Sequence, residues 1–433
     1  MKKIWQKGAL EDSEISDFVE KFTVGKDYIL DLQLLPYDIR ASKVHATGLG
    51  MIDILTKDEV SKLHTSLDKI QKKWEMGDFQ ITTAHEDGQT AIEEFLIADV
   101  GDLGKKIHTG RSRSDQALVA TKMFTQENLQ TLLEEVKNLA QNFLDFAKKY
   151  EFIPMPGYTH TQRAMLCSIG MWSGSIAEML IFNARSIAHL KDNTNYCPLG
   201  SAASFGVNIP LQREFVAKEL GFKEALTISL SASSLRGREE SQIIGGFVDI
   251  ASTLAHFAND LILFNSSEFD FFDTHSALCT GSSIMPQKKN LDSAELLRAR
   301  FSKLLGAEVM LRDITKGLMS GYHRDLQLTK EPLLESFSDI FDMVKMAKYL
   351  IQNITPKEAN IRKACTPELF AADRANELVL EGMTFRDAYR EVGNNLDQLK
   401  NVDLEENIKS KTHLGAIGNL GLEILAKRLQ ETK

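Results

Sequence analysis

The sequence predicts an all-α fold organised around a central bundle of long helices. Apolar side chains recur with the three- and four-residue spacing of a helix over four long segments. Strand periodicity is not found between these segments, which argues for a helical bundle. Several segments are apolar on more than one face, so we also expect helices of different subunits to associate. The segments cover residues 129–147, 165–187, 243–262 and 337–351.

The pattern divides the chain into three helical domains. At 433 residues the chain is too long for one simple domain. Residues 1–110 mix short helical patterns with turns, and the long helices follow within residues 111–356. After Thr355-Pro356 the helical pattern becomes shorter and more polar, so residues 357–433 are predicted to form a small C-terminal domain.

Composition argues against several classes of function. The formal net charge of −9 disfavours a general nucleic-acid-binding surface. The four cysteines stand apart without metal-ligand spacing, as in a reduced cytosolic protein that has no zinc site. Segment 243–262 is interrupted by Asp249, His256, Asn259 and Asp260, which predicts a core helix and no membrane span. The charged N-terminal stretch lacks a signal-peptide core, so we expect a cytoplasmic protein.

Three polar loops interrupt the helical pattern, at His108–Gln116, Gly157–Gln162 and Gly281–Asn290. The third combines glycine, two serines, proline, two lysines and asparagine, so its N–H groups, hydroxyls and cations suit a carboxylate or phosphate. The first could bind an anion at a helix N-terminus, or could simply be that terminus, capped by Ser112 or Ser114. Each loop also fits an ordinary polar connection between helices.

Together the loops offer cations, hydroxyl groups and one imidazole, that of His160. A cation stabilises a developing anion and a histidine shuttles protons near neutral pH, so this set suits proton transfer beside a carboxylate. A serine acts as a base only where nearby charge and N–H groups stabilise its alkoxide. The residues alone fit equally well a surface histidine and serines that only donate hydrogen bonds.

Several ordered motifs resemble the fumarase/aspartase superfamily of lyases, and within it the argininosuccinate lyase family. They are His108–Arg113, Gly157–His160, Met285–Asn290, Tyr322–Gln327 with Lys330, and Gly382–Ala388. The resemblance extends over nearly the whole chain. It implies β-elimination of argininosuccinate to arginine and fumarate, the last step of arginine biosynthesis, with no metal or organic cofactor. It also implies a homotetramer with a long central bundle and with active sites shared between subunits.

The same resemblance implies a role for each matching residue. Ser282 stands where the family has its catalytic base, which takes a proton from the carbon next to a succinyl carboxylate. Lys288 and Asn290 match the positions that hold the resulting aci-carboxylate. His160 matches the second proton-handling residue, and Glu295 matches the carboxylate that is paired with it. The further substrate-contact positions are Arg113, Ser114, Thr159, Tyr322, Gln327 and Lys330.

Glu295 also has a competing role. Asp292-Ser293-Ala294-Glu295 fits a capping box that opens the next helix, with Asp292 at N-cap and Glu295 at N3. A carboxylate that is bonded to the N-cap backbone cannot also orient His160 fully. The resemblance favours the pairing of Glu295 with His160.

The chain departs from the family pattern at several positions. Ser114 stands where the family usually has Asn, and Gln89 stands where a His is common. Leu291 replaces the usual Pro after Lys-Lys-Asn. The family's Trp-Gly-Gly-Arg-Phe is reduced to Trp5-Gln6-Lys7-Gly8, and a family Ser is lost near Gly25. These changes affect recognition of the substrate more than the elimination itself.

Two other functions are compatible with the same scaffold. A sister lyase would act on another fumarate adduct such as adenylosuccinate, which the Gln287–Asn290 and Tyr322–Lys330 patterns disfavour. An inactive structural protein would resemble the delta-crystallins of the eye lens. Nothing structural requires Ser282, Lys288 and His160 to be kept, which argues against an inactive protein.

Overall fold

The computed structural model describes residues 13–400 and 402–432, and the chain forms two compact units. Unit 1 comprises Met1–Leu129, Lys191–Gln242 and Ala307–Glu335. Unit 2 comprises Gln130–Leu190, Ile243–Gly306 and Ser336–Lys433. The division into three domains at residues 110 and 356 stays a prediction. The departure at Trp5-Gln6-Lys7-Gly8 lies outside the described residues.

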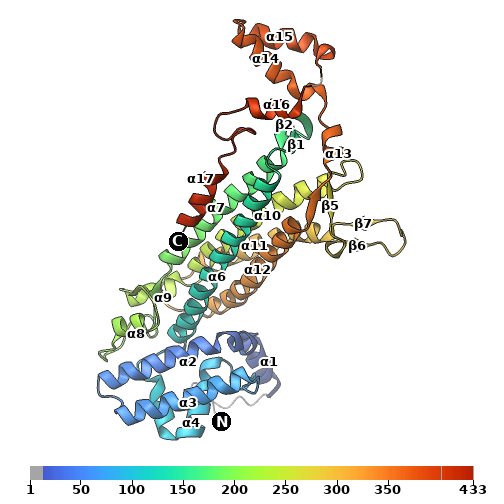
Figure 1. Ribbon diagram of the computed structural model, residues 1–433. Coiled ribbons are helices and arrows are strands. Elements are labelled where there is room, and N and C mark those ends of the chain that lie inside the picture. The colour runs from blue at the N-terminus through green and yellow to red at the C-terminus, as the bar shows by residue number, and fades with distance from the viewer. Residues whose placement is uncertain (1–12, 401, 433) are drawn as a thin grey trace. The chain divides into compact units, whose positions relative to one another are not determined.

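Unit 1 is centred on α2 (Asp27–Met51), α3 (Lys57–Glu75) and α4 (Gly88–Val100), which lie side by side (Figure 1). Helix α3 begins with a capping box, which Thr56 and Glu59 form. The buried core between the three helices includes Leu35, Ile39, Leu49, Leu63, Leu67, Ile70, Ile92 and Leu96. The other elements are α1 (Ser13–Val24), α5 (Asp102–Lys105), η1 (Lys106–His108), β3 (Tyr196–Cys197), α8 (Arg213–Glu219), β4 (Glu224–Ala225), α9 (Ser229–Leu235) and η3 (Arg324–Thr329).

Besides α2, the described residues form five long helices, and the predicted apolar periodicity falls on all of them except α11. They are α6 (Arg113–Lys149), α7 (Ile169–Asn193), α10 (Arg238–Phe264), α11 (Asp292–Thr315) and α12 (Lys330–Gln352). Within unit 2 the helices pack through aromatic rings. Phe143 of α6 meets Phe257 of α10, and Phe247 of α10 meets Phe337 of α12, each pair with 4.9 Å between ring centroids. The predicted all-α fold is confirmed.

Helix α10 is long and apolar enough to cross a membrane, judged by length and composition alone. However, Phe247, Leu254, Phe257 and Leu261 are completely buried inside the protein. Trp172 of α7 also donates a hydrogen bond to Asp260 of α10 over 2.9 Å. These contacts are those of a core helix, as the sequence predicted.

Short strands stand where the sequence predicted only loops and helices. Segment 154–168 forms a hairpin of β1 (Pro154–Thr159) and β2 (Gln162–Ser168), so Met165 lies in a strand and α7 begins only at Ile169. The loop at 281–290 is closed by β6 (Thr280–Gly281) and β7 (Lys289–Asn290). Gly281 therefore has ordinary strand geometry and is not among the residues with positive φ.

The remaining elements of unit 2 follow α10 and α12. They are β5 (Phe272–Thr274), η2 (Ser276–Leu278), β8 (Ile354–Pro356), α13 (Glu358–Lys363), η4 (Pro367–Phe370), α14 (Ala371–Leu380), α15 (Phe385–Asn394), η5 (Leu396–Gln398), α16 (Leu404–Ser410) and α17 (Leu422–Glu431). Strand β5 pairs with β8, which ties the segment after α10 to the segment after α12. As predicted, the helices become shorter after Pro356.

Candidate active site

A cavity of about 160 Å³ in unit 1 gathers five of the residues that the sequence singled out. Arg113 and Ser114 come from the start of α6, Tyr322 and Gln327 from the segment around η3, and Lys330 from the start of α12. The rest of the wall is formed by Asp27, Glu86, Asp87, Gln89, Ser112, Ala117, Arg236 and Arg324. Because cations and carboxylates share the wall, the cavity suits a ligand that carries both kinds of charge.

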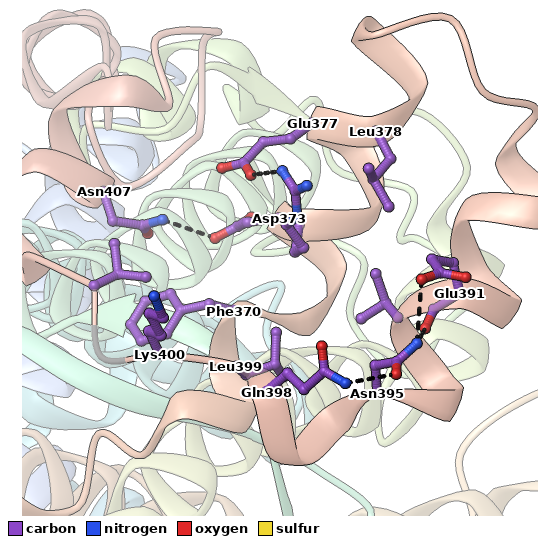
Figure 2. A pocket seen from close by; sticks show the side chains of 13 residues that line it. Phe370, Asp373, Glu377, Leu378, Glu391, Asn395, Gln398, Leu399, Lys400 and Asn407 are labelled. Atoms are coloured by element: carbon purple, nitrogen blue, oxygen red, sulfur yellow. Dashed lines mark hydrogen bonds and ion pairs between the residues drawn. The ribbon is translucent and has the colours of Figure 1, made fainter.

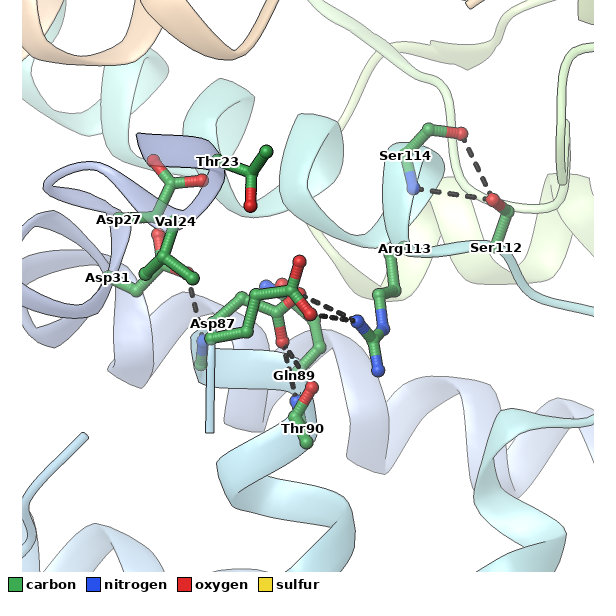
Figure 3. Close-up of polar contacts among 12 residues, drawn as sticks. Thr23, Val24, Asp27, Asp31, Asp87, Gln89, Thr90, Ser112, Arg113 and Ser114 are labelled. Carbon is green, nitrogen blue, oxygen red and sulfur yellow. Dashed lines mark hydrogen bonds and ion pairs between the residues drawn. The ribbon is translucent and has the colours of Figure 1, made fainter. Parts of the chain in front are cut away.

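Local capping places Arg113 and Ser114 in the first turn of α6. The Ser112 carbonyl accepts the Gln116 N–H over 3.1 Å, and Asp115 Oδ1 accepts the Ser112 N–H over 2.8 Å. The N–H and hydroxyl of Ser114 lie 3.4 and 3.2 Å from Ser112 Oγ (Figure 3). Of the two predicted caps, Ser112 is therefore the one that caps the helix.

Asp115 ties this helix start to the loop that follows β3. Its Oδ2 accepts the N–H groups of Gly200 and Ala202 over 3.0 and 2.8 Å. Burial raises the pKa of Asp115 to about 6, although these N–H groups, that of Ser112, and Arg111 oppose the shift. Ser114 Oγ in turn lies 3.3 Å from the Ala202 carbonyl oxygen, so the loop forms one side of the surroundings of Ser114.

Glu86 joins two guanidinium groups of the cavity. Its Oε1 accepts a hydrogen bond from Arg324 over 3.1 Å, and its Oε2 accepts one from Arg113 over 3.3 Å. Asp87 Oδ2 lies 3.4 Å from the same Arg113 nitrogen (Figure 3). Because a guanidinium carries five N–H donors, either arginine can bind a ligand carboxylate without leaving Glu86.

Lys330 is a buried cation in the wall of the cavity. Its Nζ lies 2.6 Å from Asp31 Oδ1 and 3.1 Å from Asp27 Oδ1. Burial lowers the pKa of Lys330, but the two carboxylates outweigh this effect, so the net shift is upward and the amine stays charged. Burial raises the pKa of Asp27, and Lys330 opposes that shift.

Gln327 is anchored to the end of α1. Its Nε2 donates to the carbonyl oxygens of Thr23 and Val24 over 2.9 and 3.1 Å, so a ligand's donor would have to use its amide oxygen. Gly25, near which the family serine is lost, has φ +56°, and a Cβ there would lie 3.9 Å from Gln327 Nε2. A departure from the family pattern thus lies beside a predicted substrate residue.

Gln89 is turned toward the buried Asp38. Its amide nitrogen donates to the Asp38 carboxylate, whose pKa is raised well above the usual value by burial and by Asp31. The Gln89 amide donates a hydrogen bond to the Asp38 carboxylate, and unlike the family's His it adds no titratable group. The second departure from the family pattern, Gln89, therefore has a structural role in binding Asp38.

Sequence reasoning did not assign Asp27, Glu86, Asp87 or Arg236 to the site, yet all four line the cavity. The Arg236 guanidinium lies 5.8 Å from the centroid of the Tyr322 ring, within the range of a cation–π contact. The acidic stretch around Glu86 was visible in the sequence, as was Arg236 at the end of a serine-rich segment. Nothing in a single sequence shows that the two segments converge.

Ser282 opens the exposed loop between β6 and β7 in unit 2. Its Oγ accepts the N–H groups of Ile284 and Met285 over 3.3 and 3.1 Å. Two N–H dipoles aimed at one hydroxyl oxygen stabilise negative charge on it, as a serine base requires. Lys288 is exposed in the same loop, and Asn290 pairs with Thr280 across the hairpin.

His160 lies at the tip of the β1–β2 hairpin, where Thr159 pairs with Gln162. His160 and Thr161 both have positive φ, 51° and 61°, which matches the two-residue turn that usually requires Asn-Gly. A β-branched residue is strained in this region, and such strain is concentrated at functional sites. The turn leaves the His160 side chain exposed.

Glu295 does not form the capping box that was the alternative to its pairing with His160. Helix α11 begins at Asp292, and the Glu295 N–H points to the Leu291 carbonyl over 3.4 Å, so Leu291 takes the N-cap position. The Glu295 carboxylate is exposed. Among the described residues, no hydrogen bond or ion pair joins Glu295, His160 and Ser282. Their roles in one site therefore stay a prediction.

Comparison with known proteins decides the family. Residues 12–306 match the family model described as Lyase. The chain is 40% identical over 427 residues to the argininosuccinate lyase of Sorangium cellulosum (strain So ce56), a match that covers 99% of this chain and 98% of that one. The chain belongs to the argininosuccinate lyase family. The member of this family from Thermotoga neapolitana is 38% identical, over 90% of this chain and 97% of that one.

Solved structures of other lyases share the fold of this argininosuccinate lyase family member. A variant of EDDS lyase with bound fumarate matches with a TM-score of 0.81 and 19% identity, over 95% of this chain and 89% of that one. The class II fumarase of Schistosoma mansoni matches with a TM-score of 0.72 and 15% identity, over 89% of this chain and 94% of that one. At these identities the likeness concerns the fold alone, and it agrees with the predicted superfamily-type bundle.

Proposed function

We propose that this chain cleaves argininosuccinate reversibly to arginine and fumarate, as the last step of arginine biosynthesis. The observation that carries the proposal is the mixed-charge cavity of unit 1. It gathers Arg113, Ser114, Tyr322, Gln327 and Lys330, the substrate positions implied by the family, beside the carboxylates of its wall. The substrate has carboxylates for the cations, and it has ammonium and guanidinium groups for the carboxylates.

Ser282 is the base of the proposed elimination. Its alkoxide takes the proton from the carbon next to a succinyl carboxylate, and the electron pair moves into that carboxylate to give an aci-carboxylate. Lys288 and Asn290 stabilise the added negative charge. The N–H groups of Ile284 and Met285, aimed at Ser282 Oγ, support this role because they favour the alkoxide.

Collapse of the aci-carboxylate then breaks the bond between carbon and the guanidino nitrogen. Fumarate is released, and the departing nitrogen takes up a proton to leave as arginine. His160 handles the second proton and Glu295 orients its ring, while Thr159 contacts the substrate beside it. The strained turn that exposes His160, and the exposed Glu295 carboxylate, support this assignment.

We also infer a homotetramer in the cytoplasm, with active sites that are completed between subunits. Helix α11 exposes Leu296, Leu305 and Val309, at 65%, 39% and 56% of their surfaces. A helix that leaves so much apolar surface in water gains by packing against another subunit. Association of subunits would bring Ser282 and His160 of different chains to one substrate.

The test is release of fumarate from argininosuccinate by the purified chain, followed by ultraviolet absorbance. Adenylosuccinate is assayed alongside, and analytical ultracentrifugation gives the oligomeric state. Turnover of argininosuccinate alone by a tetramer is the expected result. Turnover of adenylosuccinate alone would assign a sister lyase, and a folded tetramer without either activity would favour a structural protein.

A further inference from the structure

A second cavity, of about 390 Å³, lies within unit 2 among the C-terminal helices (Figure 2). Its walls come from η4, α14, α15 and α16, and from residues 395–400 and 402 between the last two helices. Leu378, Val392 and Leu399 give it an apolar surface, as part of the cluster that packs α14 against α15. Small-molecule sites typically occupy roughly 300–1,000 Å³ and combine an apolar surface with a few polar groups. This cavity has both features and shares no residue with the cavity of unit 1.

Asn407 holds Asp373 in place in the wall of this cavity. Asn407 is 9% exposed, and its Nδ2 donates to Asp373 Oδ2 over 2.8 Å (Figure 2). That bond fixes the orientation of the amide. Its Oδ1 is buried and accepts no hydrogen bond from any described residue. Protein atoms enclose this oxygen, so it is not open to a ligand. Lys411 Nζ also lies 2.9 Å from Asp373 Oδ2, so Asp373 Oδ1 is the oxygen that the described residues leave for a ligand cation.

The charges of the wall specify the rest of such a ligand. Figure 2 shows Asn407 and Lys400 on one side of the cavity and Glu391 on the other, with Leu399 between them. Lys400 forms no ion pair with any described residue, so it can accept a carboxylate. Among the described residues, only the Asn395 amide binds the Glu391 carboxylate, through Oε1 over 3.2 Å, which leaves Oε2 for a cation. Because Arg374 is held by Glu377 and Glu381, it adds no free cation to the site.

We propose that this cavity binds a basic α-amino acid. The α-ammonium group is directed to Asp373 Oδ1, and the carboxylate to Lys400. The aliphatic stem lies along Leu399, and the side-chain cation reaches Glu391. This is a second binding site, separate from the proposed chemistry.

L-lysine is the probe, because it is not a product of the proposed reaction. Hydrogen exchange of the full chain, followed by mass spectrometry, gives the location of binding, and calorimetry gives the affinity. L-lysine is expected to slow exchange in peptides that cover residues 371–400 and to leave those that cover 322–330 unchanged. L-norleucine lacks the side-chain cation and cadaverine lacks the carboxylate, so each is expected to bind about fivefold more weakly.

Two variants assign the contacts. Glu391→Gln should weaken the binding of L-lysine about fivefold and leave the binding of L-norleucine unchanged, because only the contact to the side-chain cation is lost. Glu406→Gln is the control, since Glu406 is exposed on α16 and does not line the cavity. Unchanged exchange in residues 371–400 at saturating L-lysine would overturn the proposal. Equal binding of L-lysine and L-norleucine would overturn the assignment of a basic ligand. Neither result depends on turnover, so the proposed reaction stands or fails separately.

Discussion

Lys330 Nζ lies 2.6 Å from Asp31 Oδ1, and the two side chains are only 3% and 1% exposed. Replacing Lys330 by Met removes the cation and leaves the carboxylate buried without it. We therefore expect the free energy of unfolding to fall by about 3–5 kcal/mol, as is usual when one partner of a buried pair is removed. Urea denaturation of Lys330→Met and wild type measures the difference.

The matched control for this pair is Lys26→Met. Lys26 pairs with Glu331 at the surface, where its own side chain is 63% exposed, and such pairs contribute little to stability. We expect its denaturation midpoint to stay at the wild-type value. Equal losses in the two variants would show that the Lys330–Asp31 pair has no special role in stability.

Ser282 and its neighbour Ser283 give a matched pair for the chemistry. Among the described residues, the N–H groups of Ile284 and Met285 point to Ser282 Oγ and not to Ser283. Ser282→Ala should lower kcat for argininosuccinate by roughly 10²–10⁴-fold, the usual contribution of a positioned base. Ser283→Ala should keep most of the activity, and both variants should keep the oligomeric state in sedimentation. Near-normal turnover of Ser282→Ala would remove Ser282 from the chemistry.

Ser114 offers a test of substrate recognition. Its hydroxyl lies 3.2 Å from Ser112 Oγ and 3.3 Å from the Ala202 carbonyl, so it is used partly within the protein. Ser114→Asn restores the family amide with a longer reach. One hydrogen bond contributes about 0.5–1.5 kcal/mol, so KM should fall roughly 2–10-fold with kcat unchanged. Steady-state kinetics decide this, and an unchanged KM would show that Ser114 does not touch the substrate.

The helices were predictable because burial periodicity is local. The spacing of apolar residues around Phe143 and Phe337 predicted buried faces, and both rings are at most 1% exposed in the core. The motif at 108–113 and the segment at 322–330 were also visible in the sequence, and they line one cavity.

Other features depend on contacts that a single sequence does not encode. Glu86 and Arg324 are bonded although 238 positions separate them, so no local pattern links them. The turn at His160-Thr161 lacks the Asn-Gly signal that usually marks such a hairpin, which is why a loop was predicted. The alternative role of Glu295 in a capping box with Asp292 was wrong, because the first hydrogen bonds of helix α11 are accepted by the Leu291 carbonyl.

His45 is a buried neutral histidine in unit 1. His45 is only 4% exposed, and its Nε2–H donates a hydrogen bond to the Thr109 carbonyl over 2.9 Å. Burial, together with Arg111, lowers the pKa of His45 from 6.5 to about 3. Between pH 6.5 and about 3, His45 therefore stays neutral in the folded chain but takes up a proton in the unfolded chain.

This shift predicts how stability depends on pH. The contribution of neutral His45 is complete above pH 6.5 and is lost as the pH falls from 6.5 toward 3. Between pH 6.5 and 5 the loss is about 2 kcal/mol, at ~1.4 kcal/mol per pH unit for one proton. In urea denaturation at both pH values, His45→Gln should lose less stability on acidification than wild type by about this amount. His413→Gln, which changes an exposed histidine, should follow wild type. If the free energy of unfolding of His45→Gln falls with pH as steeply as that of wild type, His45 is not the group that takes up this proton.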